Sequence, residues 1–346
     1  MKSEIPPQIN SKDQRESSFE LLRLLSQLII VIYHIYYLFL GKIDDDPTFK
    51  AIQMPLHVGV IVFVLLSGYF SIKATSKKLI KLLAIFLVYT MPETFYTLTH
   101  ANSLLHAVHS LFLLSYTHFW FIKTYLFLFL VSPMLNLYWH NSTNRQRWFM
   151  TMALGFVAIY MATTHGDKSM LTGKNLVNFM FLYYVGRLLS LYKYKWQKQR
   201  FLTLVSSYIF LNVIIVIAYL LLHGAARKLV WSLSYPYSSP LLLINAVLLF
   251  MIVGKFQFQS KIVNYLAASS LAIYLIHGCR PYIIGSIGDI SYYLYNHISN
   301  GFLLFASCMA LALLVLLFSI TVDKLLTPIW KYVDKAGTNI YKKLGY

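Results

Sequence analysis

An arginine and a histidine in the first apolar segment are the residues best suited to chemistry. Arg23 and His34 are eleven residues apart, which in a helix is about three turns and roughly 16 Å of rise, so both side chains return to nearly the same face. Glu20 lies three residues before Arg23, where it can form an ion pair with it. Ionisable residues inside membrane segments are costly and are commonly functional. A snorkelling arginine and a hydrogen-bonded core histidine are the simpler alternative, but the shared face favours a functional pair.

A second histidine ends a polar stripe on a later apolar segment. Ser270, Tyr274 and His277 are spaced i, i+4 and i+7, so they share one helix face. If that helix crosses the membrane, His277 reaches a depth similar to that of His34. Such a stripe can also join two neighbouring helices. The ionisable end of the stripe favours the lining of a cavity.

Two further places along the chain carry candidate substrate contacts. Trp120 and Lys123 open the fourth apolar segment, and Glu93 follows Pro92 near the end of the third. Lys123 beside aromatic residues also suits an anchor at the membrane interface. Each of these residues alone is a weak signal for a substrate cavity.

A lysine cluster follows the second apolar segment. Ser67 lies near the end of that segment, and Lys77 and Lys78 follow ten and eleven residues later in the sequence. Such a cluster attracts anionic lipid headgroups, and it equally suits the phosphates of a nucleotide-like donor. The sequence has neither a phosphate-loop glycine motif nor a zinc-ligand spacing, so we expect no metal.

The elements that must hold these residues are membrane helices. Of 346 residues, 58% are hydrophobic and only 12% are charged, about half the charge of an ordinary soluble domain, and the mean hydropathy is +0.59. This excludes a soluble globular enzyme. The net charge is +18, and the charged residues lie between the apolar runs. This distribution indicates control of topology and contact with membrane lipids rather than with nucleic acid.

The apolar runs predict an all-α, polytopic membrane protein. Because a bilayer core of about 30 Å needs roughly 20 apolar residues, we expect about ten transmembrane helices with both termini cytoplasmic. This orientation places most Lys and Arg residues in cytoplasmic loops, as the positive-inside rule requires. The expected regions are a mobile cytoplasmic tail over 1–17, a transmembrane domain over 18–328 and a basic cytoplasmic tail over 329–346. The predicted spans are about 20–40, 55–72, 78–98, 119–138, 147–164, 176–192, 201–223, 238–254, 264–284 and 301–325.

Four motifs, in order along the chain, resemble the family-3 membrane acyltransferases, bacterial O-acyltransferases of cell-surface glycans. The first helix has Arg, ten residues and then His, preceded by Glu20. The second segment closes with Phe-x-x-x-Ser-Gly-Tyr-Phe. The other two motifs are His-x-Trp-Phe at the opening of the fourth segment and Ser-x-x-x-Tyr-x-x-His in the ninth. In this sequence they are carried by Arg23 and His34, by Phe63 to Phe70, by His118, Trp120 and Phe121, and by Ser270, Tyr274 and His277. Leu24 stands where many relatives have glycine, and the start of the third helix is rich in lysine rather than arginine.

The resemblance implies transfer of an acyl group, usually acetyl, from cytoplasmic acyl-CoA to a hydroxyl of a surface polysaccharide or its lipid-linked precursor, in a bacterial plasma membrane. Arg23 would then contact the donor with Ser67, Lys77 and Lys78, and His34 would act as general base. His34 or His277 can instead carry the acyl group covalently. Some relatives have a fused extracytoplasmic domain, so we expect a separate extracytoplasmic partner protein if one is needed. Export of a glycan or lipid-linked sugar by a transporter or flippase is the alternative function.

Overall fold

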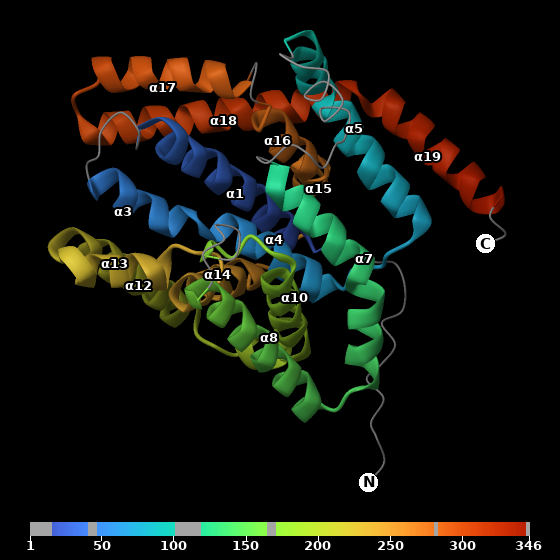
Figure 1. Ribbon diagram of the computed structural model, residues 1–346, viewed down its shortest axis with the longest axis horizontal. Coiled ribbons are helices and arrows are strands. Elements are labelled where there is room, and N and C mark those ends of the chain that lie inside the picture. The colour runs from blue at the N-terminus through green and yellow to red at the C-terminus, as the bar shows by residue number, and fades with distance from the viewer. Residues whose placement is uncertain (1–15, 41–46, 101–118, 165–170, 280–282, 344–346) are drawn as a thin grey trace.

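The computed structural model describes residues 16–40, 47–100, 119–164, 171–279 and 283–343. The regular structure in these ranges is entirely helical (Figure 1). Predictions for the N-terminal tail up to residue 15, and for His118 in the His-x-Trp-Phe motif, lie outside these residues. The helices of the described ranges are α1 (Ser17–His34), the π-helical segment η1 (Ile35–Leu40), α3 (Pro47–Leu56), α4 (Val58–Phe70), α5 (Ser76–Thr99), α7 (Trp120–Asn141), α8 (Asn144–Thr164), α10 (Leu176–Leu191), α11 (Lys193–Gln197), α12 (Phe201–Leu221), α13 (Gly224–Ser234), α14 (Pro240–Gly254), α15 (Lys261–Ala267), α16 (Ser270–His277), α17 (Gly285–His297), α18 (Gly301–Leu325) and α19 (Thr327–Lys343).

Six helical segments within the described residues are long and apolar enough to cross a membrane. They are Ser17–Leu40, Pro47–Phe70, Ser76–Thr99, Trp120–Asn141, Phe201–Leu221 and Gly301–Leu325. Two shorter helices, α10 and α14, are also apolar. The prediction of an all-α membrane protein is confirmed at this level, while the count of about ten spans and the orientation of the termini stay predictions.

The first helix lies at the centre of the bundle. α1 packs against α4, α14, α15, α16 and α18. Figure 1 shows α17 and α18 side by side along one edge of the molecule, and α12 and α13 close together at another. The polar face of α1 is therefore enclosed by protein along much of its length, with Glu20 and Gln27 buried.

Two glycines bring the backbones of α4 and α10 unusually close together. A Cβ added to Gly68 would lie 2.0 Å from the carbonyl oxygen of Tyr183, and one added to Gly186 would lie 2.3 Å from that of Leu65. Both obstructing atoms belong to helix backbone, which cannot move aside as a flexible side chain can. This packing depends on the absence of a side chain, as in other small-residue contacts between membrane helices.

Replacing Gly68 with alanine is expected to destabilise the fold by about 1–3 kcal/mol, the usual cost of overpacking a core. Thermal unfolding of the purified protein in detergent measures this effect. Gly301→Ala is the matched control, because an added Cβ there meets no atom within 4 Å and alanine favours a helix over glycine. Equal unfolding temperatures for the two variants would contradict the close-packing argument.

The predicted ninth span, 264–284, is not one continuous helix. α15 ends at Ala267, and α16 begins at Ser270 and ends at His277. At this break Ser269 Oγ donates a hydrogen bond of 2.6 Å to Asp323 of α18. Asp323 also accepts from Tyr89 of α5 and from Trp330 Nε1 of α19. Asp323 thus links the break to α5 and α19, a connection that a pattern of apolar residues does not reveal.

The C-terminal residues predicted as a tail form helix α19. This helix packs against α5, and Lys81 Nζ lies 2.9 Å from Asp334 Oδ2. The basic residues of this region are thus arranged along a helix beside α5. Both partners of the ion pair are substantially exposed, so the pair itself adds little stability.

Candidate functional site

A cavity of about 610 Å³ opens at the C-terminal end of α1. This volume falls in the usual range for small-molecule sites. A smaller cavity of about 40 Å³ is lined by His57 and Val60 of the second span and shares His34, Trp120 and Tyr274 with the larger one. The polar and aromatic side chains of the main cavity come from five separate parts of the chain: Tyr33, His34, Tyr37 and Phe39; Phe119 and Trp120; Lys174; Tyr237; and Tyr274 and His277.

The two predicted histidines meet in this cavity. His34 Nδ1 lies 2.9 Å from His277 Nε2, although the residues are 243 positions apart. The other ring nitrogen of His277, Nδ1, lies 2.6 Å from the carbonyl oxygen of Ile273. His277 is buried, and His34 is half-buried beside the open cavity.

The hydrogen bonds of the pair determine which nitrogens carry protons. A carbonyl oxygen only accepts, so Nδ1 of His277 must donate to Ile273. In a neutral His277 ring, Nε2 is then an acceptor, and Nδ1–H of His34 donates to it. His34 therefore keeps an unprotonated Nε2, the form that a general base requires.

Aromatic rings form much of the wall around the histidine pair. The ring centroids of Trp120 and Tyr237 are 5.1 Å apart. His57 lies against Tyr237 at 4.0 Å and against Tyr235 at 4.3 Å, and its Nδ1 donates to the Tyr235 carbonyl oxygen. Such faces pack well against the apolar faces of a bound molecule, whereas the histidines supply the directed polar contacts.

Lys174 brings a positive charge to the same wall. It precedes α10, and its Nζ lies 5.1 Å from the centroid of the Trp120 ring. Burial lowers the pKa of Lys174 from its usual value. The preceding residue, Gly173, has φ of +72° and is packed against Ser238. This tight turn is what directs the lysine into the cavity wall.

Arg23 lies on the same face of α1 as His34, nearer the N-terminal end. The predicted ion pair with Glu20 is confirmed: Nη1 lies 2.9 Å and 3.1 Å from the two carboxylate oxygens. Ser67 Oγ of α4 donates to Tyr125 Oη at 3.3 Å, and Tyr125 in turn lies within electrostatic range of Arg23. The structure thus places Arg23 and Ser67 in one region, away from the histidine cavity.

Gln27 lies between Arg23 and His34 on this face. Its side chain is buried, and its Oε1 accepts no hydrogen bond from the described part of the chain. A buried acceptor without a partner is uncommon and calls for an explanation. Gln27 extends the polar side chains on this face one turn beyond Arg23, and Ile30 occupies the turn between Gln27 and His34.

The other predicted site residues lie elsewhere. Lys77 and Lys78 are exposed on the first turn of α5. Glu93 is buried on α5 and Lys123 is half-buried on α7, and neither lines the histidine cavity. Of the predicted substrate contacts, the structure brings Trp120 and Tyr274 to His34 and His277.

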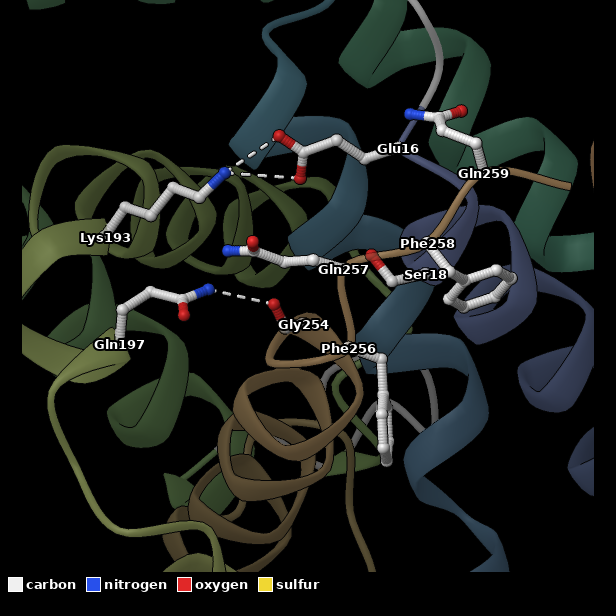
Figure 2. Close-up of a pocket in the computed structure, with 9 residues that line it drawn as sticks. All are labelled: Glu16, Ser18, Lys193, Gln197, Gly254, Phe256, Gln257, Phe258 and Gln259. Carbon is white, nitrogen blue, oxygen red and sulfur yellow. Dashed lines mark hydrogen bonds and ion pairs between the residues drawn. The ribbon is translucent and has the colours of Figure 1, made fainter.

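A second cavity, of about 520 Å³, lies at the N-terminal end of α1 (Figure 2). Lys193 Nζ forms an ion pair with Glu16 at 2.8 Å across it, and Gln197 Nε2 donates to the Gly254 carbonyl oxygen. Ser18, Phe256, Phe258 and two further glutamines, Gln257 and Gln259, complete the lining. None of the predicted site residues lines this cavity, which is separate from the histidine pair.

Sequence reasoning missed four residues around the site. His57 and Gln27 carried a signal, because each is a polar residue within a predicted apolar span. Lys174 and Tyr237 carried none, because loop residues of these types are ordinary and only the fold brings them to His34. Among the described residues, no three His, Cys, Asp or Glu side chains gather in a way that would hold a metal ion.

The fold and site define a multi-pass membrane protein in which a buried histidine pair faces an aromatic-lined cavity. The chain belongs to the membrane acyltransferase family: the family model described as an acyltransferase domain matches residues 16–321, which include every helix from α1 to α17 and most of α18. This match confirms the resemblance drawn from the four motifs. No curated protein and no solved structure matches the chain.

Proposed function

We propose that this protein is an integral-membrane O-acyltransferase that moves an acyl group, typically acetyl, from acyl-CoA to a hydroxyl of a surface polysaccharide or its lipid-linked precursor. The observation that carries the proposal is the histidine pair. His277 holds His34 with Nε2 unprotonated beside a cavity of substrate size. A neutral imidazole in this state is suited to accept a proton from a sugar hydroxyl.

The reaction then needs one proton acceptor and one route for the proton. His34 Nε2 takes the proton of the acceptor hydroxyl while the hydroxyl oxygen attacks the thioester carbonyl carbon. The carbon–sulfur bond breaks, and His34 returns the proton to the departing sulfur. The products are an ester and free coenzyme A, and His34 is again neutral.

The two histidines have different roles in this proposal. Both ring nitrogens of His277 are engaged, one by Ile273 and one by His34, so His277 has no free lone pair for attack on an acyl group. His277 is therefore a positioning residue, and His34 is the catalytic one. This favours direct transfer assisted by His34 over an acyl-His277 intermediate.

The donor is proposed to approach along the polar face of α1. Arg23, Ser67, Lys77 and Lys78 lie toward the end of the bundle at which α1 begins and α4 ends, which the positive-inside rule places in the cytoplasm. Coenzyme A is a cytoplasmic polyanion, and an arginine gives bidentate, permanently charged contacts to phosphate. The N- and C-termini are both cytoplasmic in this arrangement, and the membrane is a bacterial plasma membrane. A separate extracytoplasmic protein is a proposed partner for the acceptor side.

Acyl transfer by the purified protein tests the proposal directly. The protein in lipid vesicles is supplied with radiolabelled acetyl-CoA and cell-surface glycan, and the label in the glycan is measured. Mass spectrometry of surface glycans from cells with and without the gene gives the in vivo counterpart, with loss of acetyl groups expected. A glycan that is moved across the vesicle membrane but never labelled would indicate export instead.

Tyr274 is expected to bind substrate through its hydroxyl. This group is buried and lines the cavity beside His34, near the backbone N–H groups of Phe121 and Ile122. Replacing Tyr274 with phenylalanine removes only that oxygen, and the loss of one uncharged hydrogen bond corresponds to about tenfold in KM. Steady-state kinetics measure it, and an unchanged KM for both donor and acceptor would contradict the role.

A further inference from the structure

We propose that Lys174 binds an anionic group of the acceptor, so that the enzyme acts on an acidic glycan, with a sugar carboxylate as the anion. This inference rests on the proposed function, because it assumes that the histidine cavity receives the acceptor. It goes further by naming the charge of the substrate. Three observations support it: the charge of Lys174, the uncharged aromatic walls around it, and the distance of both from the region of Arg23 and Ser67.

Lys174 is the cation of this cavity. Among the described lining residues it is the only lysine or arginine, and none of them is Asp or Glu. Within the described part of the chain, its Nζ has no ion pair and no hydrogen bond, and its contact is with the face of Trp120 at 5.1 Å. Among the described lining residues, none thus supplies an anion to balance this charge.

The surroundings make that charge costly unless a ligand compensates it. The walls near Lys174 are aromatic and neutral: Trp120, Tyr237 and Tyr274. Burial there depresses the pKa of the lysine, because fewer water molecules stabilise the ammonium group. Charged groups removed from water are normally paired. A carboxylate or phosphate of a bound molecule can supply the partner that the described lining residues do not provide.

The position of Lys174 assigns this anion to the acceptor rather than the donor. Lys174 lies with His34 at the C-terminal end of α1, whereas Arg23 with Ser67 lies about three turns away toward the N-terminal end. The donor phosphates belong to that second region in the proposed function. A sugar ring on Trp120 would bring its carboxylate to Lys174 and a hydroxyl toward His34 Nε2.

Binding without the acyl donor tests this inference independently of catalysis. Two oligosaccharides are compared by calorimetry with the protein in nanodiscs: one that contains a hexuronic acid, and the same compound with that carboxyl reduced to an alcohol. The wild-type protein is expected to bind the acid at least about tenfold more tightly. Lys174→Gln is expected to remove this preference, and Lys174→Arg to retain most of it. Lys228→Gln, on exposed α13, removes an equal charge outside the cavity and should change nothing.

A third ligand separates the two sources of the anion. A neutral sugar on a polyprenyl diphosphate carries phosphate but no carboxylate. If Lys174→Gln weakens binding of this compound and leaves the uronic acid unaffected, the anion is phosphate and the assignment to a sugar carboxylate is overturned. If wild-type protein binds the acid and its reduced form equally, the anion site itself is disproved, whatever the transfer assay shows. Binding that discriminates the acid, combined with no acyl transfer to any glycan, would refute the proposed function and keep the anion site.

Discussion

Replacing His34 with glutamine is expected to lower the rate of acyl transfer by about 10²–10⁴-fold, the usual contribution of a general base. Glutamine keeps the size and polarity of the side chain, but its amide cannot take up a proton at neutral pH. The cavity and the fold should therefore persist while the step that activates the acceptor hydroxyl fails. Transfer of label from acetyl-CoA to glycan in vesicles measures the effect on kcat.

The control for this variant is a histidine that makes a similar local contact without facing the cavity. His297 of α17 is exposed, and its Nδ1 donates to the carbonyl oxygen of Tyr293, four residues earlier, as His277 does to Ile273. His297→Gln is expected to leave transfer unchanged. If His34→Gln kept wild-type kcat with normal expression, His34 would not be the base and the proposed reaction would lose its central residue.

Replacing His277 with leucine is expected to reduce kcat by about 10²-fold or more. The leucine removes the acceptor of the His34 Nδ1–H hydrogen bond, so the ring of His34 is free to rotate or to place its proton on Nε2 instead. In serine-protease triads, disturbing the group that orients the histidine costs as much as about 10⁴-fold. Substrate binding should change less than kcat, because only 1% of His277 is exposed.

The matched variant is His277→Gln, whose side-chain oxygen can occupy the region of Nε2 and accept from His34. This variant should recover a substantial part of the activity that His277→Leu loses. A purely structural role predicts a different result, in which both variants lower thermal stability and activity together. Equal activity of the leucine and glutamine variants at normal stability would contradict the orienting hydrogen bond.

Local features of the site followed from the spacing of residues. The periodicity of a helix returns residues eleven apart to one face, so Arg23 and His34 on α1 were expected to share it, and Glu20 was expected to pair with Arg23. The alignment of Tyr274 with His277 followed in the same way. These are properties of a single helix, in which backbone hydrogen bonds set the geometry whatever packs around it.

The features that the sequence did not reveal share a physical cause in long-range packing. At the break between α15 and α16, Ser269 donates to Asp323 of α18, and α19 packs on α5. Lys174 became part of the site because a turn at Gly173 carries it to Trp120. Each of these features involves a contact with a residue more than fifty positions away in the sequence. A pattern of apolar residues does not predict such contacts.

The amino-acid sequence by itself determined the class of protein, because long apolar runs indicate membrane helices. It also identified the two histidines, because ionisable residues are unusual within such runs. Only the tertiary structure decided that the two rings meet at 2.9 Å and which nitrogen is left unprotonated. The reason is that a proton position depends on the hydrogen-bond partners of both rings. Those partners come together only when α1 and α16 pack side by side.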